Sequence, residues 1–126
     1  MTTNLQVTID LSDPNLDEQE LETETQKLLA QMKNLEQNDE LNRVDRVSDP
    51  NPPVGGKGAG FLVGLLMAEV SKENLKKLWG FLGDRLGNKP IKLKIKAPDG
   101  QELEIEASSQ QEFEFAYQKA QAFLQG

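Results

Sequence analysis

The chain has 126 residues, a length typical of one domain, and 37% of them are hydrophobic, enough for a single core. Cysteine and histidine are both absent, which excludes disulfides, zinc–thiolate sites and catalysis by a thiol or an imidazole. The net charge is −8 over residues 1–50 and +1 over residues 51–126, so neither nucleic acid nor an anionic membrane surface is an expected partner.

No targeting or membrane segment is expected. The residues Met1–Leu5 lack the cationic and then apolar pattern of a secretory signal. The longest apolar run covers residues 59–68 and has ten residues, against the roughly 20 that a membrane span needs. The sequence therefore predicts one cytoplasmic domain over residues 1–126.

A strand, a long helix and a second strand are expected first. Leu5–Leu11 alternates apolar and polar side chains, as a half-buried strand does. Asn15 and Glu18 have the spacing of a capping box, which predicts a helix from there to about Glu36. In residues 41–47 an apolar residue stands at every third position, which indicates an edge strand or a bulge.

A loop and an apolar helical hairpin should follow. Residues 48–56 are rich in proline and glycine, which favours a loop. The hairpin covers residues 57–86, and its first helix takes residues 57–70. Ser71 and Asn74 then have the spacing of a helix start, and Gly87 is suited to end the second helix.

A β-hairpin over residues 90–107 has the clearest local pattern. Pro98-Asp99-Gly100 predicts a three-residue loop with a glycine bulge, which pairs Ala97 with Gln101. That register places the apolar residues of both strands on one face and the charged residues on the other, where solvent is expected. The charged residues that face each other are then Lys92 and Glu106, Lys94 and Glu104, and Lys96 and Glu102.

The last helix should begin at Ser109 and Glu112, a second capping-box spacing, and its apolar face includes Phe113 and Ala116. The element order is therefore β-α-β-α-α-β-β-α. This order predicts an α+β two-layer sandwich, a four-stranded mixed sheet with helices on one face.

Two patterns resemble ligand sites but lack a required residue. Residues 55–60 place glycines and a lysine at a predicted helix start, yet a P-loop needs serine or threonine where Gly58 stands. Residues 13–24 fit a calcium loop at several positions, but Glu18 occupies the position that requires glycine. The serines occur at caps and in loops, so we expect no catalytic residue and hence no enzyme. Because both ligand patterns are incomplete, we expect no metal and no cofactor either.

The predicted helix over residues 57–70 carries the candidate interaction site. Gly56, Gly60 and Gly64, at its start and within it, recur at every fourth position, a spacing that lets another helix approach closely. Its other sides are apolar too, so the helix must be buried either in its own domain or against a partner. The residues expected at the interface are Gly56, Gly60, Phe61, Gly64, Leu65 and Trp79.

The same segments carry a family resemblance. Pro52–Gly58 precedes an apolar helix, a second helix with Trp79 ends near Arg85-Leu86, and a basic strand leads through Pro98-Asp99-Gly100 to a strand and a helix. Over residues 41–124 this arrangement resembles the effector-associated constant component family of bacterial, cyanobacterial-type conflict systems. The resemblance implies a small α+β protein that accompanies caspase-like or trypsin-like proteases and related effectors, and it provides no catalytic residue to carry over.

Three functional hypotheses follow. In the first, the chain is an accessory or adaptor module that binds a protein partner, such as a protease effector or its regulator, through the glycine-rich helix. In the second, it is a structural protein that assembles into a homo-oligomer. In the third, it is a regulatory domain that senses a small ligand or an anion at the loop of residues 55–60.

Overall fold

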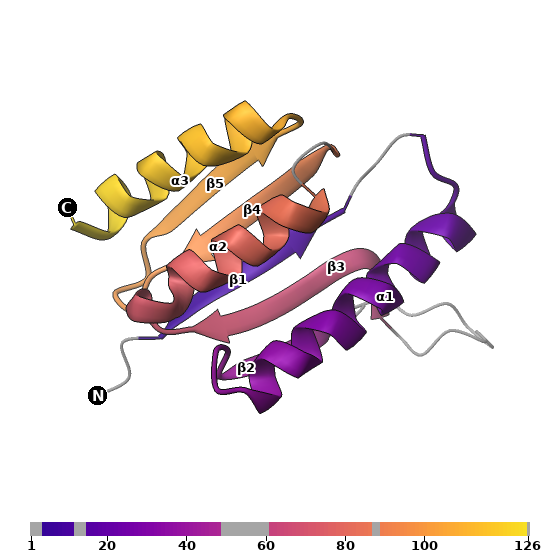
Figure 1. Cartoon of the computed structure of the whole chain (residues 1–126), viewed down its shortest axis with the longest axis horizontal. Coiled ribbons are helices and arrows are strands. Elements are labelled where there is room, and N and C mark those ends of the chain that lie inside the picture. The colour runs from indigo at the N-terminus through magenta and orange to yellow at the C-terminus, as the bar shows by residue number, and fades with distance from the viewer. Residues whose placement is uncertain (1–3, 12–14, 49–60, 87–88, 126) are drawn as a thin grey trace.

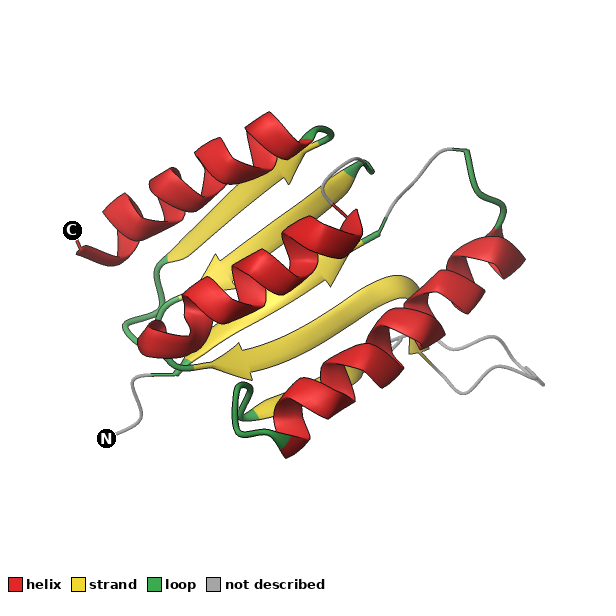
Figure 2. Cartoon of the chain, viewed as in Figure 1, coloured by secondary structure: helices red, strands yellow, loops and turns green. Residues whose placement is uncertain are grey.

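The computed structural model describes residues 4–11, 15–48, 61–86 and 89–125, and these residues form a sheet covered on one face by three helices (Figures 1 and 2). The sheet has five strands in the order β2-β3-β1-β4-β5, and every neighbouring pair is antiparallel. The elements in chain order are β1 (Leu5–Asp10), α1 (Glu18–Gln37), β2 (Arg43–Ser48), β3 (Phe61–Val70), α2 (Lys72–Leu86), β4 (Ile91–Lys96), β5 (Glu102–Ala107) and α3 (Gln110–Gln125).

The predicted helix over residues 57–70 is wrong, because residues 61–70 form the strand β3. With β3 between β2 and β1, the sheet has five antiparallel strands instead of four mixed ones. The described part of the predicted helical hairpin, residues 61–86, is a strand followed by a helix. The cause lies in the apolar run itself, since a short buried strand and a buried helix look alike in composition. The α+β class, the two layers and the placement of the helices on one face agree with the prediction.

The two faces of the sheet differ sharply in character. On the face beneath the helices, Val7 of β1 lies between Ala68 of β3 and Ile95 of β4, and all three are buried. On the other face, Thr8 lies between Met67 and Lys94. The exposed lysines of β4 and glutamates of β5 continue this second face, so the predicted alternation of the hairpin is confirmed.

The register of the β4–β5 hairpin is also confirmed. Ala97 N–H donates to the Gln101 carbonyl at 2.8 Å, and Gly100 has a φ of 93°, the left-handed region that favours glycine. Every predicted pair of facing charges occurs in the register. The ion pairs include one direct pair, Lys92–Glu106 at 3.5 Å, and one diagonal pair, Lys94–Glu102 at 3.1 Å.

The helices begin at side-chain caps. Asp17 caps α1 and forms a capping box with Glu20, so the predicted start at Asn15 and Glu18 lies two residues too early. Ser71 accepts a hydrogen bond from the Asn74 amide, as predicted for the start of α2. Ser109 does the same for Glu112 at the start of α3. The proposed helix end at Gly87 lies outside the described residues.

An ion pair fastens α1 to the edge strand β2. Arg46 lies on the helix-covered face of the sheet, where its two terminal nitrogens donate to the two carboxylate oxygens of Glu22 at 2.9 and 2.6 Å. Only 11% of the Arg46 side chain and 31% of the Glu22 side chain are exposed, so water screens the pair little. The hydrogen bond from Arg46 lowers the pKa of Glu22 below its ordinary value.

Candidate interaction site

The residues predicted for an interface do not share one surface. Gly56 and Gly60 lie outside the described residues, and Phe61 begins β3. Gly64 and Leu65 follow one another in β3, so they lie on opposite faces of the sheet. Trp79 belongs to α2. Because residues 61–70 form a strand, the glycine ridge of a helix cannot account for these positions.

Gly64 allows α1 to approach β3 closely. It is buried, its φ is 84°, and a Cβ atom added to it would lie 3.1 Å from a methyl carbon of Leu21. Its carbonyl accepts a hydrogen bond from the Leu11 amide at 2.8 Å, which prolongs the pairing of β1 with β3. In the described structure Gly64 therefore shapes the contact between a helix and the sheet.

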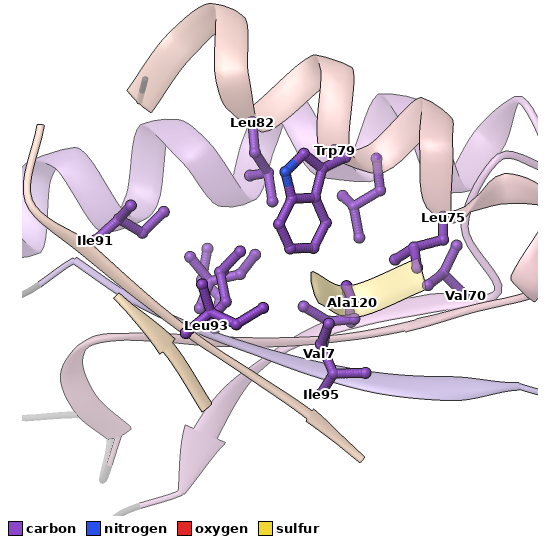
Figure 3. Packing of buried hydrophobic residues seen from close by; sticks show 14 of the residues in the cluster. Val7, Val70, Leu75, Trp79, Leu82, Ile91, Leu93, Ile95 and Ala120 are labelled. Carbon is purple, nitrogen blue, oxygen red and sulfur yellow. The ribbon is translucent and has the colours of Figure 1, made fainter. Parts of the chain in front are cut away.

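Trp79 lies in the core, where Figure 3 shows it among the buried hydrophobic residues, and it joins α2 to α3. It is only 4% exposed, and its Nε1–H donates to the Phe113 carbonyl at 3.1 Å. Its ring centroid lies 5.1 Å from that of Phe113 and 5.4 Å from that of Tyr117. These contacts leave little of the Trp79 side chain for a partner in this conformation.

The outer edge of β5 offers backbone groups to solvent. Hydrogen-bonded and non-hydrogen-bonded pairs alternate along an antiparallel ladder. Since Ala97 and Gln101 form a bonded pair, the odd-numbered residues of β5 direct their backbone N–H and C=O groups toward β4. Those of Glu102, Glu104 and Glu106 then point to the outer edge, with which no strand of the described residues pairs.

A groove of about 500 Å³ lies between β5 and α3, which follows β5 in the chain and runs beside it (Figure 1). Its α3 wall consists of residues spaced three and four apart, which places them on one side of the helix. The lining residues are Glu104, Ile105 and Glu106 of β5, and Gln111, Glu112, Phe115, Ala116 and Lys119 of α3.

Phe115 is the most unusual residue of this groove. Its side chain is 57% exposed, and it is the only large hydrophobic side chain that is exposed among the described residues. The ammonium group of Lys119 lies 4.9 Å from the centre of its ring, a cation–π contact. Single exposed hydrophobic side chains are common on protein surfaces, so the interest of Phe115 comes from its position beside an open strand edge, which can pair with another chain.

The charge of the groove is predominantly negative. Glu104, Glu106 and Glu112 line it together with a single cation, Lys119. Both the backbone amide and the hydroxyl of Ser108 donate to Glu112 at 2.8 Å, and these hydrogen bonds lower the pKa of Glu112. The carboxylate of Glu112 is thus ionised and fixed in position at neutral pH.

Sequence reasoning did not find this groove, although one of its residues gave a signal. Phe113 and Ala116 belong to the predicted apolar face of the last helix. Phe115 stands between them in the sequence but lies on the polar side of the helix. A single aromatic residue on the polar side of a helix is by itself a weak signal, and it gains weight only beside the open edge of β5. The open strand edge had no such signal, because the order of the strands in the sheet cannot be read from the hairpin alone.

Comparison with protein families, curated proteins and solved structures finds no match. Among the described residues, no helix is long and apolar enough to cross a membrane. The same part of the chain contains no cluster of three or more acidic side chains arranged to hold a metal ion. The open edge of β5 and the groove beside it are therefore the strongest candidate site in the described structure.

Proposed function

We propose that this chain is a non-catalytic protein-binding module that takes up an extended segment of a partner protein along the outer edge of β5. The observation that carries the proposal is the open backbone edge of β5 next to a groove that contains the exposed ring of Phe115. Strand addition of this kind obtains affinity from main-chain hydrogen bonds and specificity from alternate side chains.

The alternation of β5 defines the partner segment. A residue placed opposite Glu104 has its side chain on the same open face as Glu102, Glu104 and Glu106. Lysine or arginine at these alternate positions would pair with the glutamates, as the lysines of β4 do on the other side. The intervening residues would face the groove, where apolar side chains can cover Ile105 and Phe115.

A second copy of this chain fits the same edge poorly. If two β5 edges met in the antiparallel sense, the glutamates of one copy would lie beside those of the other, which is unfavourable. The other edge strand, β2, would bring one acid and one base, Asp45 and Arg43, to the same open face, so it lacks the row of basic residues that would match the glutamates. The acidic edge therefore favours a basic segment from a different protein over self-assembly.

The resemblance to the effector-associated constant component family motivates an accessory or adaptor role for this binding, although the apolar helix that carried part of that resemblance is the strand β3 in the structure. On that basis the partner we propose is a caspase-like or trypsin-like protease effector, or its regulator. The extended segment would belong to that partner, and this chain would contribute recognition without chemistry of its own.

A peptide selection with matched variants tests the proposal. Random peptides displayed on phage are selected on the wild-type chain, and the enriched sequences should alternate basic and apolar residues. Binding of the selected peptides is then measured to the Glu104→Pro variant, which lacks an outward N–H that β4 does not use. The variant should fold, because proline is tolerated on such an edge. Glu104→Gln serves as the control that removes the charge and keeps the N–H.

Glu104→Pro should abolish peptide binding, and Glu104→Gln should weaken it about two- to fivefold, as expected for one exposed ion pair. Phe115→Ala should also weaken binding strongly while changing the free energy of unfolding by less than about 0.5 kcal/mol, since the side chain is mostly exposed. Undiminished binding to a folded Glu104→Pro variant would refute strand addition. Enrichment of acidic peptides would refute the proposed partner chemistry.

A further inference from the structure

A separate cavity of about 170 Å³ lies between α1, the C-terminal part of α2 and the residues just before β4. It is distant in sequence from β5 and α3, and it shares no lining residue with the groove described above. Its apolar lining residues are Leu11, Leu16, Leu21, Leu28 and Pro90. Its polar lining residues are Glu24, Lys27, Gln31, Arg85 and Lys89.

Cations outnumber carboxylates around this cavity. Lys27 and Lys89 are both paired with one residue, Glu24, at 3.9 and 3.7 Å. Arg85 adds a third positive charge. The rim therefore carries a net charge of about +2 in a chain whose net charge is −7, and such a reversal of sign attracts an anion.

Arg85 is held in place beside the cavity. Its Nε–H donates to the side-chain oxygen of Gln31 at 2.8 Å, and its guanidinium carbon lies 4.1 Å from the centre of the Phe81 ring. These two contacts orient the guanidinium group before any ligand arrives. A guanidinium group has five N–H donors in a planar arrangement that matches a carboxylate, so the bond to Gln31 uses only part of its capacity.

We propose that this cavity binds a small organic monoanion, a carboxylate attached to an apolar body about the size of one aromatic ring. An apolar cavity of about 150 Å³ accommodates benzene, which sets the scale for the body. The leucines surround that body, and Arg85 with Lys89 binds the carboxylate at the rim. This ligand site goes beyond the binding of a protein segment at β5.

Phenylacetate is a suitable probe because it combines the charge and the ring. It is titrated into the isotope-labelled chain while the methyl and amide resonances are followed by NMR. Acetate, which has the charge without the ring, and phenylacetamide, which has the ring without the charge, are the matched controls. Phenylacetate should shift the resonances of Leu16 and Leu28 in a saturable manner, and each control should bind at least about fivefold more weakly.

Variants then identify the rim. Arg85→Gln and Lys89→Gln should each weaken phenylacetate binding about fivefold, the effect of losing one charge partner near the surface. Lys96→Gln, which removes an exposed lysine at the other end of β4, should leave it unchanged. Glu104→Pro should leave it unchanged too, because this site is independent of the β5 edge.

Each of the following results would contradict binding of a carboxylate with an apolar body in this cavity. Absence of shifts at the cavity with phenylacetate, at the highest soluble concentration, would overturn it. Equal binding of phenylacetamide would show that the charge is not recognised, and equal binding of acetate would show that the apolar cavity is not used; either result would overturn the proposed ligand class. Unchanged affinity in both Arg85→Gln and Lys89→Gln would overturn the assignment of the rim.

Discussion

Replacing Gly64 with alanine should destabilise the chain, because this residue has a φ of 84° within β3. An L-residue other than glycine in the left-handed region costs about 1–2 kcal/mol. The new methyl group would also lie 3.1 Å from a terminal carbon of Leu21, which must shift by a few tenths of an ångström. Since Leu21 is half-buried and its far end can move, this contact should add less than the backbone term.

The expected loss in the free energy of unfolding is therefore about 1–3 kcal/mol, measured by urea denaturation followed by circular dichroism. Gly80→Ala is the matched control, because Gly80 lies in α2 and a Cβ atom there would meet nothing within 4 Å. That control should stabilise the chain by up to about 1 kcal/mol, since alanine has the higher helix propensity.

The sign of the change in unfolding free energy caused by Gly64→Ala distinguishes the strand β3 from the helix that the sequence predicted. If residues 57–70 formed a helix, Gly64→Ala should raise stability by up to about 1 kcal/mol, as expected for Gly80→Ala. A stabilising Gly64→Ala variant would therefore refute both the strand β3 and the close approach of α1. Measuring Gly64→Ala in a Leu21→Ala background separates the backbone cost from the contact with Leu21. In that background only the backbone cost of Gly64→Ala should remain.

Further substitutions test other parts of the fold. Gly100→Val should lose about 1–2 kcal/mol of unfolding free energy in the same assay, because the residue has a φ of 93°. Trp79→Phe should lose about 1–3 kcal/mol, since the buried Phe113 carbonyl loses its donor, and an unchanged midpoint would contradict that contact. Glu22→Gln should lose about 1–3 kcal/mol at neutral pH. Because Arg46 lowers the pKa of Glu22 from 4.5, the pair stabilises the fold above that pH, and this contribution disappears as the pH falls through the lowered pKa. The difference between the Glu22→Gln variant and the wild type, measured by urea denaturation across this range, should therefore vanish in acid; a constant difference would refute the assignment to the ion pair.

The hairpin of β4 and β5 could be predicted from the sequence because its determinants are local. Pro98, Asp99 and Gly100 define the turn, and the turn and the alternation of lysine and glutamate define the same register. The start of α2 at Ser71 was predictable for the same reason, since a cap acts over only three residues.

The strand β3 could not be predicted in this way. It lies between two other strands and its apolar residues occur on both faces, so the period of two is weak. In the structure, Leu66, Ala68 and Val70 face the helices while Glu69 lies on the other face, a pattern that is visible once the strand is known. The cavity beside α1 was also beyond sequence reasoning, because its residues come from separate segments that only the fold brings together.

Amide hydrogen exchange of β5, with and without a selected peptide, tests the central proposal most directly. In the free chain the amides of Leu103, Ile105 and Ala107 should exchange slowly, while those of Glu102, Glu104 and Glu106, which point to the open edge, should exchange fast. On binding, the glutamate amides should become protected as the peptide adds a strand. Protection confined to other surfaces, with the glutamate amides still exchanging fast in the complex, would contradict the account.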